Sequence, residues 1–254
     1  MKSPIAWLGS KRRMADTILG MMPDHVCYVE PFAGSASVLF ARDEPAKVEV
    51  LNDINNELVN FFRVIQHHLV EFCAQFRWSI SSRQMFEWQE ATPAQTLTDI
   101  QRAARFYYLH KLAFGARPTG RTFGTATVTP PKLNLVRLEE DMSATHQRLA
   151  RVTIENLPWE KCIERYDRPH TLFLLDPPYW QLAGYGVPFP LAEYRRLREV
   201  IAGITGKAIL TINDHPDMRE IFAGLRSRKV ELTYTVGRDK TKAKKSAERI
   251  YRSW

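Results

Sequence analysis

The residues best suited to chemistry lie in the stretch Thr171–Trp180, TLFLLDPPYW. Asp176 is a carboxylate, Pro177 contributes a carbonyl that accepts hydrogen bonds, and Tyr179 adds a planar ring. Together these groups suit a flat substrate with an exocyclic amine, because the amine donates to the two acceptors while its ring stacks on the tyrosine. The same residues are also compatible with an ordinary surface turn after a strand, so other motifs have to decide between the two.

The element that positions Asp176 is predicted to be a buried strand. Leu172–Leu175 is an unbroken apolar run, as in strands that are covered on both faces of a parallel sheet. The two prolines after Asp176 cannot continue a sheet ladder and therefore end the strand. Ligands of open α/β sheets bind at the carboxyl ends of the strands, which is where this carboxylate is expected.

A second possible site follows an earlier strand. Val26–Val29 is apolar and ends at Glu30, and the turn PFAGS comes next, with Phe32 and Gly34 inside it. Gly34 allows the backbone to approach a ligand closely, and the helix that opens after it offers unpaired N–H groups. A single glycine is less than the dinucleotide fingerprint requires, so the turn does not predict a pyrophosphate loop.

Asp53 follows the next strand, Val48–Leu51, about twenty positions after the glycine turn. A carboxylate at this place binds ribose hydroxyls in βαβ nucleotide sites. Asp53 is equally well placed to cap the helix predicted over Asn55–His68, which carries an apolar stripe. The two roles are compatible with each other.

The amino-terminal segment Pro4–Arg13 places Trp7 and Lys11 on either side of a turn at Gly9 and Ser10. An aromatic side chain and a cation in this arrangement suit an aromatic ligand that carries a carboxylate. A packed tryptophan and a solvated lysine explain the same pattern, and the segment alone does not separate the two interpretations.

Composition narrows the classes of protein. The 254 residues carry a net charge of +8, which favours an anionic partner and nucleic acid before membrane. No apolar run is long enough to span a membrane, and the amino terminus does not resemble a signal peptide. The three cysteines are far apart and lack metal-ligand spacing. We therefore expect a cytoplasmic protein with buried thiols and no metal, in a bacterial or phage-infected cell.

Four motifs together identify a family. The motifs, in chain order, are Trp7…Lys11, Glu30-Pro31-Phe32-Ala33-Gly34, Asp53-Ile54-Asn55 and Asp176-Pro177-Pro178-Tyr179. With these motifs in this order and at suitable distances, the chain resembles the Dam-like (D12 class, α-group) DNA adenine N6-methyltransferases. The resemblance covers nearly the whole chain and is greatest to the compact forms of phages and prophages.

The resemblance implies the fold. We expect an α/β protein with a Rossmann-like S-adenosylmethionine-dependent methyltransferase sheet, mostly parallel, with helices on both faces. Residues 1–66 and 152–254 would form the catalytic domain, and 67–151 an inserted helical target-recognition subdomain. Helical spacing within the insertion predicts helices over Ser82–Glu90, Asp99–Leu112 and Leu138–Leu149. The last strand is predicted over Ile250–Trp254.

The resemblance also implies roles for the motif residues. S-adenosylmethionine would be the methyl donor, leaving S-adenosylhomocysteine, and Lys11 would offer a cation to its carboxylate end. The catalytic residues would be Asp176, Pro177 and Tyr179. The cofactor would be bound by Trp7, Lys11, Glu30, Phe32, Gly34, Asp53 and Asp176. Asn213-Asp214-His215 resembles a family motif near the target pocket, although a helix-capping turn explains it nearly as well.

Two basic stretches are the predicted contacts to double-stranded DNA. The loop Gly115–Asn134, rich in Gly, Thr and Pro, carries Arg117, Arg121 and Lys132, and a basic loop near the carboxyl end carries Lys244 and Lys245. Solvated surface explains both stretches as well. The stretch Leu109–Ala116, which leads into the first loop, departs from the family's commoner Asn-Arg…Phe-Asn-Gly pattern, so recognition of GATC is not predicted. We expect no membrane association and no obligate protein partner.

Other chemistries are less well supported. Cytosine N4-methyltransferases more often have Ser where Asp176 stands, and enzymes that methylate protein amides have Asn. A methyltransferase acting on RNA is a further alternative. A catalytically silent DNA-binding protein on the same scaffold belongs to a different class, and it would bind the cofactor without turnover.

Overall fold

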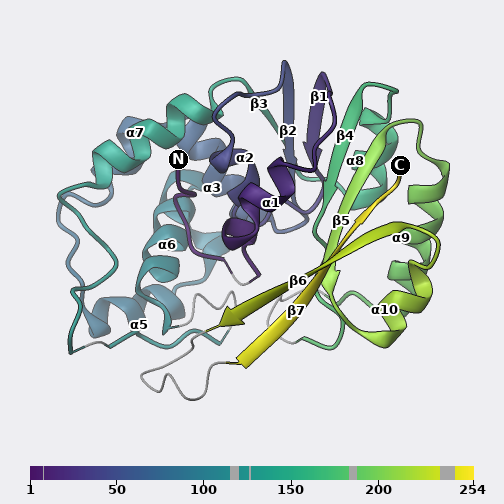
Figure 1. Ribbon diagram of the computed structural model, residues 1–254. Helices are drawn as coiled ribbons and strands as arrows, with labels where there is room; N and C mark the ends of the chain where they lie inside the picture. Colours follow the sequence, from purple (N-terminus) through teal and green to yellow (C-terminus); the bar gives the residue numbers. More distant parts are fainter. Residues whose placement is uncertain (8, 115–119, 126, 183–187, 235–243) are drawn as a thin grey trace.

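The computed structural model describes the chain except for residues 8, 115–119, 126, 183–187 and 235–243. At its centre lies a seven-stranded sheet in the order β3-β2-β1-β4-β5-β7-β6 (Figure 1). The strands are β1 (Cys27–Glu30), β2 (Val48–Asn52), β3 (Val152–Glu155), β4 (Thr171–Leu175), β5 (Lys207–Asn213), β6 (Arg226–Tyr234) and β7 (Lys244–Arg252).

Strand direction defines the type of sheet. The neighbouring pairs β3–β2, β2–β1, β1–β4 and β4–β5 are parallel, and β7 is antiparallel to both β5 and β6. The order 3-2-1-4-5 is that of Rossmann-type sheets, in which the connections reverse between β1 and β4 and leave a crevice at their carboxyl ends. The expected Rossmann-like α/β fold is confirmed.

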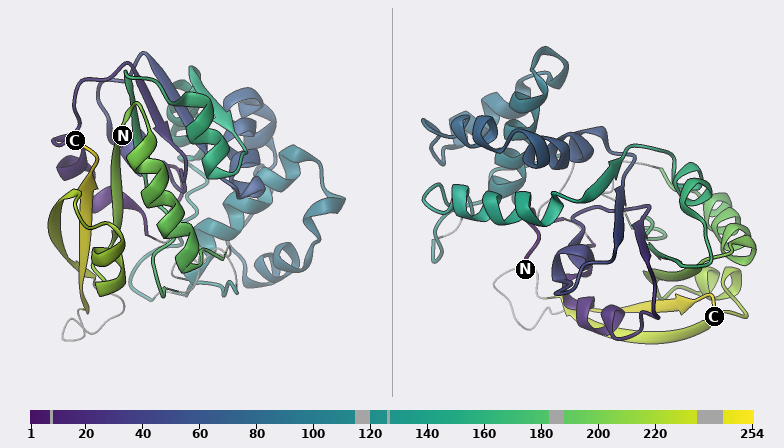
Figure 2. Two further views of the ribbon diagram at one scale, coloured as in Figure 1. Left: turned by 90° about the vertical axis from the view of Figure 1, so that its right-hand side faces the viewer. Right: turned by 90° about the horizontal axis from the view of Figure 1, so that it is seen from above.

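Helices cover both faces of the sheet (Figure 2). β4 shows how the sequence achieves this, because its successive side chains point to opposite faces. Leu172 and Leu174 belong to the core on one face, and Phe173 and Leu175 to the core on the other. The first face is covered by α1 (Ala15–Leu19), α2 (Ser37–Ala41) and α3 (Asn56–His67), and the second by α8 (Trp159–Tyr166), α9 (Leu191–Gly203) and α10 (Pro216–Ile221).

The helices of 67–151 extend the first core. They are α4 (Leu69–Ala74), α5 (Arg83–Ala91), α6 (Asp99–Leu112) and α7 (Leu138–Leu149), with the short turn η2 (Ala94–Thr96). The rings of Phe106 and Tyr107 on α6 lie 5.6 and 5.8 Å from that of Phe61 on α3. Helical side chains of this region therefore share one hydrophobic cluster with the sheet. α6 and α7 have the bounds that the sequence predicted, and α5 differs by one residue at each end.

The prediction for the last strand was wrong. β7 begins at Lys244 and pairs with both β5 and β6, whereas the sequence analysis placed the last strand at Ile250–Trp254 and a basic loop before it. The sequence Lys244–Ser246 has no apolar alternation, and this end of the strand is defined by its backbone pairing with β6.

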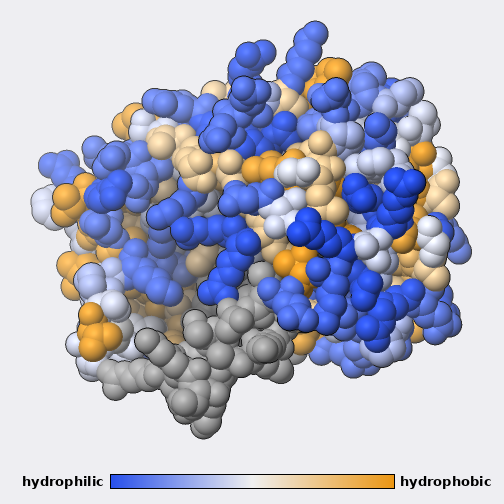
Figure 3. All heavy atoms as spheres, viewed as in Figure 1, coloured by the Kyte–Doolittle hydropathy of each residue, from blue (hydrophilic) through white to orange (hydrophobic). Residues whose placement is uncertain are grey.

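Figure 3 shows hydrophilic side chains over much of the face seen in Figure 1. Across the described part of the chain, no helix has both the length and the apolar character that crossing a membrane requires. The same residues contain no group of three His, Cys, Asp or Glu side chains arranged to hold a metal ion. Cys27, Cys73 and Cys162 are free thiols.

Candidate active site

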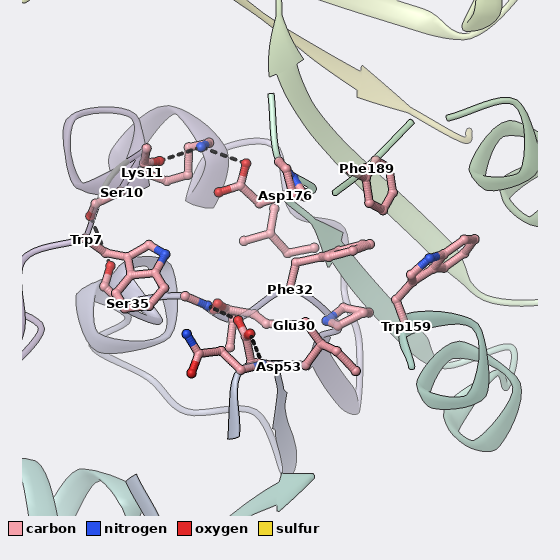
Figure 4. Close-up of a pocket in the computed structure, with 18 of the residues that line it drawn as sticks. Trp7, Ser10, Lys11, Glu30, Phe32, Ser35, Asp53, Trp159, Asp176 and Phe189 are labelled. Atoms are coloured by element: carbon pink, nitrogen blue, oxygen red, sulfur yellow. Dashed lines mark hydrogen bonds and ion pairs between the residues drawn. The ribbon is translucent and has the colours of Figure 1, made fainter. Parts of the chain in front are cut away.

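A cavity of about 390 Å³ lies at the carboxyl ends of β1, β2 and β4. Figure 4 shows side chains from several distant segments around it, among them Trp7, Lys11, Phe32, Asp53, Trp159 and Asp176. The cavity therefore occupies the place where the order of the strands reverses, which is the usual ligand site of such sheets. The short turn η1 (Lys11–Arg13) carries Lys11 into this lining.

Trp7 lines the cavity, and its indole is positioned by the glycine turn after β1 and by α6. A Cβ atom at Gly34 would lie 3.0 Å from Cδ1 and Nε1 of Trp7, and Gly34 has a φ of +49°, so both space and backbone conformation require glycine there. The imidazole of His110, on α6, stacks on the indole with 5.2 Å between ring centroids. The sequence analysis did not identify His110, because nothing local links α6 to the amino terminus.

Asp53 ties the glycine turn to the start of α3. Its Oδ2 accepts the N–H of Gly34 and its Oδ1 accepts that of Asn55, each at 2.9 Å. The side chain that caps α3 is Asn55 rather than Asp53, because Asn55 accepts the N–H groups of Glu57 and Leu58. Burial raises the pKa of the Asp53 carboxyl, and the backbone N–H groups oppose that rise.

Glu30 is held within the fold at the edge of the cavity. Its Oε1 accepts the hydroxyl of Tyr28 at 2.8 Å and the N–H of Leu39 in α2 at 3.0 Å. Burial raises the pKa of Glu30 to about 8, so the carboxyl is largely protonated at neutral pH. Its described hydrogen bonds therefore stabilise the junction of β1 and α2.

Asp176 is fixed through one of its two oxygens. Nζ of Lys11 lies 2.6 Å from Oδ1, and the Thr211 hydroxyl on β5 donates to the same oxygen at 2.8 Å. Oδ2 has no hydrogen bond or ion pair to the residues that the structure describes. Burial raises the pKa of Asp176 to about 6, and the Lys11 cation beside it opposes that rise. The carboxylate is therefore anchored on one side and open on the other (Figure 4).

Tyr179 and Pro177, the other predicted catalytic residues, do not line the cavity. Tyr179 is buried, its hydroxyl donates to Oε2 of Glu248, and Nζ of Lys11 lies 4.5 Å from the centroid of its ring. The Pro177 carbonyl accepts no hydrogen bond from the described residues. Lys11 contacts both Asp176 and Tyr179, so it joins the cavity to the region of the tyrosine.

An aromatic wall closes the other side of the cavity. The ring of Phe32 lies 6.0 Å from Trp159, at the start of α8, and 5.8 Å from Phe189. The indole N–H of Trp159 donates to Oε2 of Glu193 at 3.1 Å. Of these four residues the sequence analysis named only Phe32. The available signal for Trp159 was its place just after a strand, at the sheet edge where ligands bind.

The predicted DNA contacts of the first loop have different surroundings. Arg117 lies outside the described residues. Nη1 of Arg121 lies 3.4 Å from a carboxylate oxygen of Glu90, and its Nη2 lies 3.5 Å from Nε2 of His110. Lys132 is exposed. Arg121 is thus engaged with side chains of α5 and α6.

The other two predicted DNA contacts, Lys244 and Lys245, are the first residues of β7. They stand opposite Tyr234 and Thr233 of β6. These two lysines therefore belong to a strand and not to the basic loop that the sequence analysis predicted, and residues 235–243 between the strands lie outside the described part of the chain.

Fold and site together define a class of protein. A Rossmann-like sheet with a glycine turn after β1, a carboxylate after β2 and a cavity at the switch point is the architecture of nucleotide-type ligand sites. Asp176 of the Asp-Pro-Pro-Tyr turn lines the same cavity and presents a carboxylate, which accepts hydrogen bonds. This combination is that of a methyltransferase acting on an exocyclic amine.

Comparison with known proteins gives the family. The model of the D12 class N6 adenine-specific DNA methyltransferases matches residues 7–236, and the chain belongs to this family. The Type II methyltransferase M.CviBI of Paramecium bursaria Chlorella virus NC1A is 25% identical, over 92% of this chain and 91% of its own. The DNA N-6-adenine-methyltransferase of Escherichia phage P1 is 24% identical over 87% of this chain, which corresponds to only 31% of the phage protein.

Two further matches are partial. The Retron Ec67 DNA adenine methylase of Escherichia coli is 29% identical over 44% of this chain and 40% of its own. Among solved structures, SMU.472 complexed with SAH aligns at 13% identity and a TM-score of 0.41, over 98% of this chain and 54% of that one, which is too weak to bear on the fold. Membership of the family confirms the resemblance: the protein is a DNA adenine N6-methyltransferase, and its methyl donor is S-adenosylmethionine.

Proposed function

We propose that the protein methylates, in a specific sequence context, an adenine that is flipped out of double-stranded DNA, and that Asp176 holds the N6 amine. The observation that carries this proposal is the geometry of Asp176. Lys11 and Thr211 hold its Oδ1, while Oδ2 has no partner among the described residues and is available to accept a hydrogen bond. A carboxylate fixed in this way needs little reorganisation when the amine arrives.

The adenine amine needs acceptors because its lone pair is delocalised into the ring and makes N6 a poor nucleophile. Oδ2 of Asp176 and the Pro177 carbonyl would accept its two hydrogens, which favours a pyramidal nitrogen and stabilises the positive charge that develops there. The base cannot be reached inside a duplex and has to be flipped out. Stacking on Tyr179, worth about 1–3 kcal/mol per base, would offset part of the cost of unstacking.

The residues around the cavity fit the methyl donor. When bound, S-adenosylmethionine supplies an electrophilic methyl group. Phe32 and Trp159 offer flat apolar faces for its adenine ring, and Asp53 offers carboxylate lone pairs to its ribose hydroxyls. Gly34 brings backbone to the cavity wall without a side chain, while Trp7 and Glu30 form the rest of the site.

The ion pair at Asp176 refines the role expected for Lys11. Its Nζ is engaged with Asp176 and with the Gly9 carbonyl, in both cases at 2.6 Å. We therefore propose that Lys11 acts first on the catalytic carboxylate, whose ionised form it favours, and only secondarily on the carboxylate end of the cofactor.

DNA would bind across the two parts of the chain. In this proposal residues 1–66 and 152–254 form the catalytic domain and 67–151 recognise the target. Figure 1 shows α5 of the insertion and the adjoining ends of β6 and β7 along the same lower edge of the molecule, which supports a single DNA path past both. Its phosphate contacts would come from Arg117, Arg121, Lys132, Lys244 and Lys245.

The test is methyl transfer from labelled S-adenosylmethionine to unmethylated genomic DNA, followed by nucleoside digestion and single-molecule mapping of the modified base. We expect N6-methyladenine in one sequence context. Asp176→Ala should lose most of the transfer and keep DNA binding, whereas Asp24→Ala, which replaces an exposed carboxylate, should behave as the parent. Near-normal turnover by Asp176→Ala would overturn the role of Asp176, and cofactor binding without any modified base would overturn the activity.

A further inference from the structure

A buried glutamate far along the chain contacts the tyrosine of the Asp-Pro-Pro-Tyr turn. Glu248 of β7 is 2% exposed and Tyr179 is 6% exposed. The Tyr179 hydroxyl donates to Oε2 of Glu248, so the hydrogen bond joins two buried side chains. Burying a carboxylate is costly, so its presence here requires a compensating contact such as this one.

The register of the sheet shows that Glu248 is part of a larger arrangement. Glu248 stands directly opposite Asn213 of β5. The amide of Asn213 accepts the N–H of Trp180 at 3.0 Å and donates to the carbonyl of Trp180 at 3.1 Å. Since opposite residues of a strand pair share one face of the sheet, the two side chains hold consecutive residues of the turn from the same side.

A third contact lies on the same face. Thr211, two positions before Asn213 in β5, donates its hydroxyl to Oδ1 of Asp176. The carboxyl end of β5 and the middle of β7 therefore fix the carboxylate, the tyrosine hydroxyl and the backbone that follows it. Each contact is to a different residue of one rigid turn, which limits the tilt of the turn as a whole.

The contact to Tyr179 has a specific geometric effect. Lys11 lies over its ring and Glu248 holds its hydroxyl, so the plane of the ring is restrained at a face and at the tip. A stacking surface has to be in place before the flipped base arrives, because misplacing reacting groups by about 1 Å can cost about 100-fold in rate. A tyrosine without its tether could tilt about its side-chain bonds and would receive the base in several orientations.

We propose that Glu248 is a positioning residue for methyl transfer, which fixes the ring of Tyr179 so that the adenine stacks with N6 directed at Asp176. This inference rests on the proposed function, because it takes Tyr179 to be the surface on which the base stacks. Glu248 itself touches neither substrate nor cofactor in this account. It acts through the tyrosine.

The test compares kinetic constants of the full-length protein on unmethylated plasmid DNA. Glu248→Ala should lower kcat by about 10- to 100-fold while leaving the KM for S-adenosylmethionine within about twofold. Glu248→Gln keeps an oxygen that accepts the tyrosine hydroxyl and should recover most of the rate. Tyr179→Phe keeps the ring but removes its tether, so it should reproduce the fall in kcat, and adding Glu248→Ala to it should cause little further loss.

A matched control exists elsewhere on the sheet. The Tyr166 hydroxyl donates to Oε1 of Glu155 at 2.7 Å, so Glu155→Ala breaks a tyrosine–glutamate hydrogen bond that lies outside the cavity lining. It should lower the melting temperature and leave kcat unchanged. S-adenosylhomocysteine binding, measured by calorimetry on every variant, shows whether the cofactor half is intact.

The outcomes separate the two proposals. Parental kcat in Glu248→Ala or Tyr179→Phe would overturn the positioning role, as would additive losses in the double variant. Full activity of Tyr179→Ala would overturn the stacking role of the tyrosine and with it that part of the proposed function. Should Glu248→Ala fail to fold, Tyr179→Phe alone decides, because it removes the same hydrogen bond without leaving a cavity.

Discussion

Lys11 and Asp176 form a partly buried ion pair, with 2.6 Å between Nζ and Oδ1 and side chains that are 4% and 21% exposed. The pair joins the amino-terminal turn to the end of β4, across the cavity rim. Because a buried carboxylate is destabilised in its charged form, the neighbouring cation is what favours ionisation of Asp176. The charge state of Asp176, which the proposed mechanism requires to be ionised, therefore depends on a residue from another segment.

The pH dependence of kcat should report Asp176. Its pKa is raised to about 6 by burial. In the proposed mechanism the ionised carboxylate accepts one amine hydrogen at Oδ2, beside the Pro177 carbonyl, and stabilises the positive charge that develops on N6. Protonation below that pKa removes an acceptor, so kcat should be constant above about pH 7 and fall about tenfold per pH unit well below 6. His110 does not explain a fall of kcat near pH 6, the acid limb of the profile, because burial and Arg121 lower the pKa of its imidazole to about 3. Equal kcat values at about pH 5 and pH 8 would contradict the assignment.

Lys11→Met should move that limb. Methionine has nearly the length of lysine and no charge, so the variant removes the group that lowers the pKa of Asp176. The acid limb of kcat should shift upward by about one pH unit or more, and the loss of activity should be larger at pH 7 than at pH 9. Arg12→Met removes an exposed cation from the same turn and should leave the limb in place. A uniform loss at every pH would show that Lys11 acts otherwise.

Much of the architecture follows from local sequence. The run Leu172–Leu175 and the prolines after it fix a buried strand that ends at a carboxylate, and α6 begins at a capping box of Thr98 and Gln101. Features of this kind depend on residues that are close together in the sequence. Helical spacing sufficed for the bounds of α6 and α7. The type of sheet and several of the residues that line the cavity were predicted from the motifs through the resemblance to the family.

The features that escaped prediction depend on packing between distant segments. His110 stacks on Trp7 only because α6 packs on α3, and Trp159 meets Phe32 only across the crevice. The start of β7 is determined by backbone pairing with β6, and Lys244–Ser246 has no alternation of apolar and polar residues from which a strand could be predicted. Likewise Glu248 has the local sequence context of an ordinary charged strand residue. The residues that make such contacts can be predicted only once the arrangement of the helices and strands is known.

Gly34→Ala should damage the cofactor site. The φ of Gly34 is +49°, which costs a residue with a side chain about 1–2 kcal/mol, and the new Cβ would lie 3.0 Å from Trp7. We expect a lower melting temperature and a KM for S-adenosylmethionine that rises more than the KM for DNA. Gly224→Ala is the matched control, because Gly224 has a φ of +85° and a Cβ added there would meet no atom within 4 Å, so it should lose stability and keep the KM. Equal KM effects in both variants would mean that strain alone is responsible.

The lysines that open β7 should contribute to DNA binding through charge. Replacing Lys244 and Lys245 with Ala removes two cations, and each phosphate contact contributes about 0.9 to the slope of log K against log salt concentration, so the slope should fall by about two if both contact phosphates. Binding should weaken for all sequences alike, because phosphate contacts carry no sequence information. Lys161→Ala with Arg165→Ala removes the same charge from the exposed surface of α8 and should leave the slope unchanged. An equal change in both double variants would indicate a general effect of net charge, and an unchanged slope in the first would place the DNA path away from the β6–β7 end of the sheet.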